Sequence, residues 1–249
     1  MTDVDYQGKK ETDMANAKKA SQNRDAAEVF RPVGEENDLR TRVSPVVVRR
    51  LPRYHRYLGE LLREGIYRIS SAELSKMMEV NASQIRQDLN CFGGFGQQGY
   101  GYNVKFLYGK IGEVLGTEDG FRAVIVGAGN LGRALAASHM FERRGIERIA
   151  MFDVKDDLVG KKISDLPVLN VSELESFCER EKPEIAVLTV PKEAAYDVSV
   201  RLAKAGVRGI WNFANMELKL DEYPDVYILN VHLGDSLMVL SYGIRSREK

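Results

Sequence analysis

The stretch AVIVGAGNLGRAL, from Ala123 to Leu135, constrains the fold of this chain more than any other part of the sequence. A short apolar run leads into the pattern G-x-G-x-x-G at Gly127, Gly129 and Gly132, and a helix-forming segment follows. A strand that turns through three such glycines into a helix is typical of a βαβ unit that binds the pyrophosphate of a dinucleotide. The stretch therefore predicts a parallel α/β sheet with a nucleotide site at this turn.

A second apolar run, RIAMFDV, supports a nucleotide site because it ends in Asp153, 21 residues past Gly132. An acid at this distance accepts hydrogen bonds from the adenosine ribose, and it would repel a 2′-phosphate, which favours NAD over NADP. In this interpretation Gly127 makes the tight turn, Gly129 lets the backbone approach the pyrophosphate, and Gly132 allows contact between helix and strand. The alternative is a βαβ unit that holds no nucleotide.

Two more strands follow the glycine motif, within EIAVLTVP (184–191) and GIWNF (209–213). In a doubly wound sheet, the loops at the carboxyl ends of the strands line the ligand crevice. Residues 189–191 and 212–214 stand at two such ends, although ordinary strand-to-helix turns would look the same in sequence.

Length and composition allow one or two domains in 249 residues, with 44% hydrophobic and 29% charged residues, as in ordinary globular proteins. No apolar run approaches the ~20 residues that span a bilayer, and the start of the chain lacks a signal-peptide core, so we expect a cytoplasmic protein. Cys91 and Cys178 lie far apart with no metal-binding spacing, which predicts neither a disulfide framework nor a metal site.

Charge is unevenly distributed along the chain. Residues 1–42 carry 8 basic and 9 acidic groups and few large apolar side chains, which predicts a disordered tail. Residues 43–110 carry 10 basic and 5 acidic groups, whereas residues 111–249 carry 18 and 22. The basic middle segment points to a polyanionic partner.

The basic segment has the pattern of three short helices. Ser44 and Pro45 begin a helix predicted to run from Val46 to Glu64. The spacing Ser70-x-x-Glu73 predicts a capping box for a second helix to about residue 78, and Asn81-x-x-Gln84 predicts another for a third helix to about residue 92. The glycine and aromatic stretch CFGGFGQQGYGYNV then predicts a β-hairpin, so the segment is typical of a winged helix-turn-helix.

The third helix is the one expected to enter the major groove. Ile85 and Leu89 would hold it on the core, and its polar residues would contact bases, since arginine can grip guanine and glutamine can pair with adenine. The arginines of the first helix either form a solvated face or contact phosphates or another domain. The expected DNA-contacting residues, including a tyrosine of the wing, are Arg49, Arg53, Ser83, Gln84, Arg86, Gln87 and Tyr100.

From about Val43 to its end, the chain resembles the Rex family of redox-sensing transcriptional repressors. The resemblance rests on the order and spacing of SSAEL, QIRQDLNCFGGFGQQGYGYNV, IVGAGNLGRAL, FDV, LTVP and NFAN. It implies an α/β protein in which an N-terminal winged helix (43–110) precedes a Rossmann domain (111–229) and a C-terminal helix (230–249) that crosses to the other subunit of a swapped homodimer. Packing of that helix on its own sheet is the alternative.

The resemblance further implies a palindromic operator as DNA partner and NAD(H) as the ligand, with NADH releasing the repressor. It places the nicotinamide near the two strand ends described above. The residues expected to bind the ligand are Gly127, Ala128, Gly129, Asn130, Leu131, Gly132, Asp153, Thr189, Val190, Pro191, Asn212, Phe213 and Ala214.

The chain departs from the family at residues that the resemblance links to redox switching. Most of the family has a tyrosine where this chain has Ser138 and an aspartate where it has His232, and both act with a first-helix arginine, matched here by Arg56. Gln87 likewise stands where a basic residue is usual. Because histidine can change charge near neutral pH, His232 facing Arg56 of the partner would make the response depend on pH; a solvent-exposed His232 without a role is the alternative.

Two other functions are compatible with a nucleotide site. One is an NAD-dependent oxidoreductase with a helical accessory domain, and the other is a repressor that responds to a different nucleotide. The three histidines, His55, His139 and His232, stand in no recognisable catalytic setting. We therefore expect a regulator with no catalytic residues.

Overall fold

The computed structural model describes residues 43–92 and 101–247, in two compact units that meet between Gly116 and Thr117. The expected disordered tail (1–42) and most of the expected hairpin, Tyr100 included, lie outside the described residues. The domain boundary expected after residue 110 falls inside a helix of the first unit, so the division lies several residues later than the sequence suggested.

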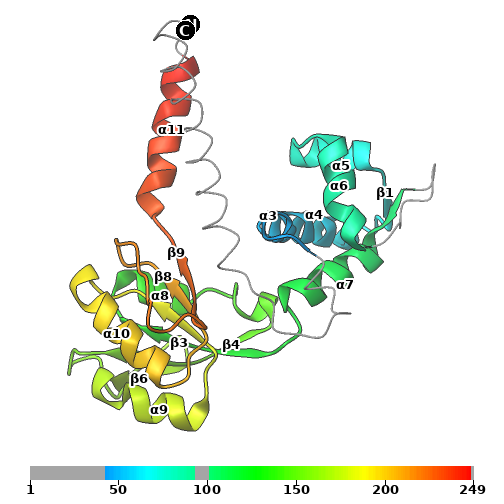
Figure 1. Ribbon diagram of the computed structural model, residues 1–249. Coiled ribbons are helices and arrows are strands. Elements are labelled where there is room, and N and C mark those ends of the chain that lie inside the picture. The colour runs from blue at the N-terminus through cyan, green and yellow to red at the C-terminus, as the bar shows by residue number, and fades with distance from the viewer. Residues whose placement is uncertain (1–42, 93–100, 248–249) are drawn as a thin grey trace, which may run out of the picture. The chain divides into compact units, whose positions relative to one another are not determined.

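The first unit is a helical domain with one short two-stranded sheet (Figure 1). Its core gathers Leu51, Tyr54 and Leu58 with Ile85 and Leu89, all of them buried. In chain order its elements are α3 (Pro45–Val48), α4 (Leu51–Arg63), β1 (Arg68–Ile69), α5 (Ser71–Met78), α6 (Ala82–Leu89), the 3-10 turn η1 (Asn90–Phe92), β2 (Tyr102–Asn103) and α7 (Val104–Leu115).

The single helix expected over residues 46–64 is wrong, because the chain turns at Arg49 and Arg50 and divides it into α3 and α4. Pro52 explains the break. In a continuous helix the N–H of residue 52 would donate to the carbonyl of Val48. Proline has no N–H, and its ring would clash with that carbonyl. Ser44 caps α3 as expected, with its hydroxyl accepting from the N–H of Val47 at 3.4 Å.

Only one of the two expected capping boxes forms. Ser70 N–H donates to Glu73 at 2.8 Å and Glu73 N–H donates to the Ser70 hydroxyl at 3.1 Å, which confirms the first box. Asn81 also caps α6, but the Gln84 side chain bonds to Asp88 and not to the backbone N–H of Asn81. The second predicted capping box is therefore wrong. Asp88 competes successfully for the Gln84 amide, as described below.

The expected wing is described only at its ends. There β2 pairs antiparallel with β1, with Ile69 opposite Tyr102 and Arg68 opposite Asn103. The strand that precedes α5 thus pairs with the strand that precedes α7, an arrangement in keeping with a winged helix.

The second unit contains a seven-stranded sheet in the order β5–β6–β4–β3–β7–β8–β9. Its strands are parallel except β5, which runs antiparallel to β6 at one edge. The order reverses at β3 and β7, the switch point at which doubly wound sheets bind ligands. The elements are β3 (Phe121–Val126), α8 (Asn130–Ala136), η2 (Glu142–Arg144), β4 (Ile146–Asp153), β5 (Lys162–Ile163), β6 (Leu166–Asn170), η3 (Val171–Glu173), α9 (Leu174–Glu181), β7 (Ile185–Leu188), α10 (Lys192–Lys204), β8 (Gly209–Asn212), β9 (Tyr227–Asn230) and α11 (Leu233–Arg247).

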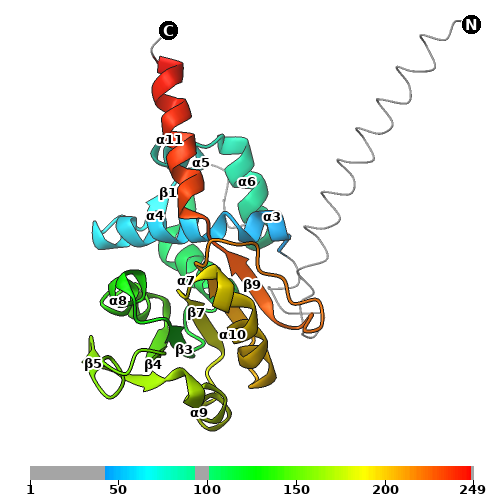
Figure 2. The ribbon, with the colours of Figure 1, turned by 90° about the vertical axis from the view of Figure 1, so that its left-hand side faces the viewer.

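Alternate residues of the central strands enter the cores on the two faces of the sheet. Val124 and Val126 pack with α9 and α10, whereas Ile125 packs with α8 on the opposite face. Figure 2 shows α8 on one side of the sheet and the other two helices beyond it. A strand buried on both faces is expected to be apolar throughout, as the run from Ala123 to Val126 is.

The C-terminal helix α11 buries none of its described side chains. Its apolar residues include Leu237, Val239 and Tyr242, which are 66%, 72% and 75% exposed. In Figure 1 this helix continues from β9 and leaves the sheet. Among the described residues, the structure contains no helix that combines the length and apolar character needed to cross a membrane.

Candidate nucleotide site and recognition helix

The glycine turn stands at the carboxyl end of β3, beside the switch point of the sheet. Gly127 has a φ of +103°, which side chains rarely tolerate, and a Cβ there would lie 2.8 Å from the carbonyl oxygen of Thr189. Its N–H donates to the carbonyl of Phe152 at 2.8 Å, which ties the turn to β4. Only glycine fits at this position.

The other two glycines of the motif have opposite surroundings. A Cβ on Gly132 would lie 1.9 Å from the carbonyl oxygen of Gly127, so the absence of a side chain lets α8 approach the turn. A Cβ on Gly129 would meet nothing within 4 Å, and this residue is exposed where α8 begins. The space in front of Gly129 is therefore open at the place where the pyrophosphate of a dinucleotide lies in this fold, so the turn fits the ligand.

Asp153 ends β4 and lies against the glycine turn. Its carboxylate accepts the N–H of Ala128 at 2.6 Å and that of Lys155 at 3.0 Å. Each carboxylate oxygen can accept more than one hydrogen bond, so the half-buried group can still bind the hydroxyls of a ribose. The arrangement joins the acid and the glycines in one site, as the spacing predicted.

Thr189 brings the second strand end to the same site. Its hydroxyl donates to the carbonyl of Gly127 at 2.8 Å, and its N–H donates to the carbonyl of Val126 at 2.8 Å. Val190 and Pro191 follow directly and lead into α10. The ends of β3 and β7 are thus joined by hydrogen bonds at the switch point.

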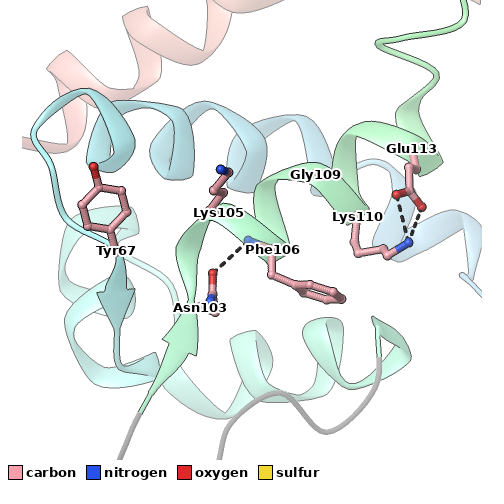
Figure 3. Close-up of a pocket in the computed structure, with 7 residues that line it drawn as sticks. All are labelled: Tyr67, Asn103, Lys105, Phe106, Gly109, Lys110 and Glu113. Atoms are coloured by element: carbon pink, nitrogen blue, oxygen red, sulfur yellow. Dashed lines mark hydrogen bonds and ion pairs between the residues drawn. The ribbon is translucent and has the colours of Figure 1, made fainter.

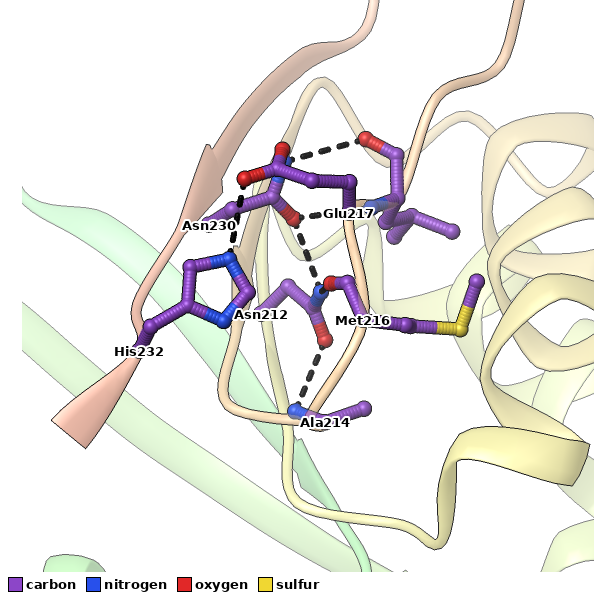
Figure 4. Close-up of polar contacts among 7 residues, drawn as sticks. Asn212, Ala214, Met216, Glu217, Asn230 and His232 are labelled. Atoms are coloured by element: carbon purple, nitrogen blue, oxygen red, sulfur yellow. Dashed lines mark hydrogen bonds and ion pairs between the residues drawn. The ribbon is translucent and has the colours of Figure 1, made fainter. Parts of the chain in front are cut away.

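The third strand end is held by a network of side-chain amides (Figure 4). The side chain of Asn212 is buried, accepts the N–H of Ala214 at 2.9 Å, and donates to Met216 at 3.1 Å and to Asn230 at 2.8 Å. Both amide hydrogens of Asn212 are therefore used within the protein. Asn212 shapes the loop after β8, whereas half-buried Phe213 follows it at the strand end.

The same network reaches the residues that lead into α11. Asn230 donates to Glu217 at 2.9 Å, and Glu217 also lies 2.9 Å from Nε2 of His232 (Figure 4). The His232 side chain is 24% exposed. Within one subunit, the partner of His232 is therefore the carboxylate of Glu217. The family resemblance places an aspartate at position 232 in most members, whereas this chain has a histidine there that contacts an acid.

The other two residues expected in the switch lie in different units. The Ser138 hydroxyl accepts the N–H of Met140 at 3.3 Å just after α8, and the exposed Arg56 guanidinium lies 5.4 Å from the centre of the Tyr57 ring.

Helix α6, which the sequence predicts to enter the major groove, is fixed to the first unit by a buried carboxylate. Asp88 is 1% exposed and accepts two hydrogen bonds from Arg50, at 2.7 and 2.5 Å, and one from the Tyr54 hydroxyl at 2.9 Å. Gln84 donates a fourth at 2.8 Å. Burial by itself raises the pKa of Asp88, but the bonds from Arg50, Gln84 and Tyr54 outweigh it and hold that pKa below its ordinary value.

The exposed residues of α6 include Ser83, Arg86 and Gln87. Arg86 reaches the hydroxyl of Ser71 at the start of α5, at 3.2 Å, and Ser83 donates its hydroxyl to Asn81 at 2.7 Å. These three residues and Gln84 are the base-contacting candidates from α6, and Gln84 alone among them is turned toward the buried carboxylate.

The arginines of α3 and α4 divide into two groups. Arg50 is bound to Asp88, and Arg53 donates to the carbonyl of Met78 at the end of α5. Arg49 and Arg56 are exposed. The sequence left open whether these four arginines form a solvated face or contact phosphates or another domain. The structure shows that two of them make bonds that anchor helices.

A hollow of about 540 Å³ lies in the first unit beside α7 (Figure 3). Phe106 and Lys105 line it together with Lys110, which pairs with Glu113 at 2.7 Å. No residue of the glycine turn lines this hollow, and it is separate from the nucleotide site.

Two family models match the chain in the two units. One, described as the N-terminus of putative DNA-binding proteins, matches residues 42–90, and another, described as a CoA binding domain, matches residues 118–216. A winged helix-turn-helix joined to a Rossmann domain is the combination expected of a ligand-responsive DNA-binding regulator.

Curated relatives identify the regulator more closely. The chain is 49% identical over 209 residues to the redox-sensing transcriptional repressor Rex of Thermoanaerobacter pseudethanolicus, which covers 84% of this chain and 92% of that protein. It is 50% identical over 200 residues to Rex of Clostridioides difficile, covering 80% and 94%. The chain belongs to the Rex family of redox-sensing transcriptional repressors.

Solved structures agree with this membership. A complex of the protein RSP with β-NAD⁺ and operator DNA matches with a TM-score of 0.76 at 50% identity, covering 83% of this chain and 94% of that one. A complex of RSP with β-NADH matches with a TM-score of 0.75 at 47% identity, covering 83% and 96%. These findings confirm the expected fold class, and the family is one of repressors, as expected for a regulator without enzymatic activity.

Sequence reasoning missed three residues that the structure shows to be central. Asp88 is an acid between Ile85 and Leu89 on the buried face of α6, and that position is the signal that could have found it. Asn230 and Glu217 carry no such signal, because their contacts join segments that are distant in sequence.

Proposed function

We propose that this chain is a DNA-binding repressor whose hold on its operator is set by NAD(H) in the crevice at β3 and β7. The observation that carries the nucleotide assignment is the glycine turn, where Gly127 and Gly132 exclude side chains and Gly129 faces open space beside Asp153. When bound, the dinucleotide supplies no chemistry of its own to a reaction and acts as a signal.

In this proposal the turn from Gly127 to Gly132 holds the pyrophosphate through backbone N–H groups, and Asp153 accepts hydrogen bonds from the ribose. Thr189, Val190, Pro191, Phe213 and Ala214 border the nicotinamide side of the crevice. Asn212 acts by shaping the loop that Phe213 and Ala214 begin.

The DNA-binding part is the first unit, with α6 in the major groove. Arg86 and Gln87 contact base edges, and Ser83 and Arg49 contact bases or phosphates. A repressor of this kind works where the chromosome is, so we place it in the cytoplasm.

We further propose a homodimer formed through α11. A helix with seven large apolar side chains at least 55% exposed needs a partner, and Tyr227 and Leu229 of β9, 45% and 50% exposed, extend the same kind of surface onto the sheet. A second copy of the chain provides a matching surface, and a two-fold dimer matches a palindromic operator. NADH then favours an arrangement of the two subunits that is unfit for successive major grooves.

The deciding experiment is a titration of operator binding, measured by fluorescence anisotropy, with NADH and NAD⁺ added separately. We expect NADH to release the DNA at concentrations at which NAD⁺ does not. Equal responses to the two forms would contradict redox sensing, and release by neither would contradict the nucleotide assignment. Turnover of NADH with small carbonyl compounds would instead support the oxidoreductase.

A further inference from the structure

Gln84 and Gln87 are two glutamines of α6 that the sequence predicts to contact bases. In the structure their side chains have different surroundings. Gln87 is exposed, whereas Gln84 is half-buried on the flank of the helix nearest Asp88. Because residues i and i+4 are neighbours on a helix, Gln84 lies directly over Asp88, and its amide donates to that carboxylate at 2.8 Å.

The hydrogen bond from Gln84 stabilises the buried charge of Asp88. It is a buried carboxylate, and such a group is stable only when its oxygens are satisfied by hydrogen bonds. Arg50 and Tyr54 supply three donors from α4 and the turn before it, and Gln84 supplies the fourth from α6 itself. Turning Gln84 toward DNA would remove one of these donors from the buried charge.

Arg50 and Tyr54 hold the rotation of α6 about its axis, because both lie outside this helix and bond to its Asp88. Arg50 grips Asp88 with two parallel bonds, a geometry that fixes direction as well as distance. With Asp88 held inward, Ser83 and Arg86 lie on the opposite side of the helix, and Gln87 lies about 100° around the helix from Asp88. All three side chains are exposed.

We propose that Gln84 is not a base-reading residue and that Asp88, with Arg50 and Tyr54, is the positioning residue that determines which side chains of α6 read the operator. The reading set is then Ser83, Arg86 and Gln87. This inference rests on the proposed DNA-binding function and makes it more specific.

The test compares Gln84→Met with Gln87→Met, a matched pair of near-isosteric changes on one helix. The wild type and both variants are each used to select duplexes from a random-sequence DNA pool, and base preferences at every position are compared. We expect Gln84→Met to retain the wild-type preferences within about twofold, and Gln87→Met to lose preference about tenfold or more at one base pair of each half-site.

Several outcomes would overturn the proposal. A changed base preference in Gln84→Met would make Gln84 a reader, and unchanged preferences in both variants would remove Gln87 from the reading set. If the wild type selected no sequence at all, the proposed DNA-binding function would itself be wrong, so the two failures are distinguishable.

Asp88→Asn tests the positioning role separately. It removes the charge that Arg50 grips while preserving side-chain shape. We expect weaker selection across the whole half-site, with binding to unrelated DNA at low salt unchanged, because a merely less stable protein would lose both in proportion. A folded Asp88→Asn protein with wild-type preferences would overturn the positioning role; if this variant fails to fold, the glutamine pair still decides the reading set.

Discussion

The two units hold their functional elements by different means. In the first unit, side chains hold α6, with the carboxylate of Asp88 bonded to Arg50 and Tyr54. In the second, backbone groups and missing side chains hold the turn, where Gly127 N–H bonds to Phe152 and Gly132 touches Gly127. The comparison teaches that exposed residues of α6 can be exchanged one at a time, whereas the glycine turn has no room for a side chain at Gly127 or Gly132.

The largest effect should come from placing valine at Gly132, with the same change at Gly129 as its comparison. Gly132→Val should lower the free energy of unfolding by at least about 3 kcal/mol, because its Cβ would overlap the carbonyl of Gly127. Gly129→Val should change it by no more than about 1 kcal/mol, because its Cβ meets nothing within 4 Å. Urea denaturation measures both.

Gly129→Val should nevertheless lose nucleotide affinity at least about 100-fold, equivalent to about 2.7 kcal/mol, because its side chain fills the space of the pyrophosphate. Calorimetry with NADH measures this loss, and operator binding should persist without a response to NADH. Normal NADH affinity in folded Gly129→Val would mean that the nucleotide binds elsewhere.

The anchor of α6 should respond to acid. Bonds from Arg50, Gln84 and Tyr54 outweigh burial and lower the pKa of Asp88, so ionised Asp88 stabilises the fold above its unfolded pKa of about 3.9. The stabilisation is lost as the pH falls through the lower folded value. At pH 6 the free energy of unfolding of the wild type should exceed that of Asp88→Asn by about 1.5–3 kcal/mol.

This difference in the free energy of unfolding should shrink below pH 4. Urea denaturation of both proteins at pH 6, 4 and 3 measures it. A difference that stays constant across this range would show that the charge of Asp88 contributes nothing. Glu64→Gln, which changes an exposed carboxyl just after α4, provides a control for acid effects unrelated to burial.

A third prediction concerns the exposed face of α6. Arg86→Ala should weaken specific operator binding by ~1–3 kcal/mol through the loss of a contact to a base, while NADH affinity stays the same. A gel-shift assay at fixed salt measures the operator affinity. Unchanged affinity would contradict the assignment of α6 as the recognition helix.

The smallest effect should come from His232. We expect His232→Asn to change the NADH response by ~0.2–1 kcal/mol, because its contact with Glu217 joins side chains that are 24% and 66% exposed.

Glu217→Gln tests whether this contact is responsible, when operator binding is titrated with NADH at constant ionic strength. The same change in both variants would assign the effect to the His232–Glu217 pair. A change in His232→Asn alone would assign it to a contact with Arg56 of the partner subunit. A wild-type response in His232→Asn would leave His232 without a role.

Features that depend on neighbouring residues in the chain could be predicted with confidence from sequence. The Ser70–Glu73 capping box formed as its spacing required, and the glycine turn joined Asp153 at the end of the next strand. Pro52 was equally local and was overlooked, so the break between α3 and α4 was an error of interpretation and not a lack of information.

Sequence alone therefore determined the Rossmann turn, the helices α5 and α6 and the family, because steric demands of glycine and capping bonds act over a few residues. Only the tertiary structure decided that Gln84 turns to Asp88 and that Asn212 and Glu217 join Asn230 and His232. The physical reason is competition: an amide or a carboxylate has several possible partners in sequence, and the one it takes depends on which buried charge or carbonyl the fold brings within 3 Å.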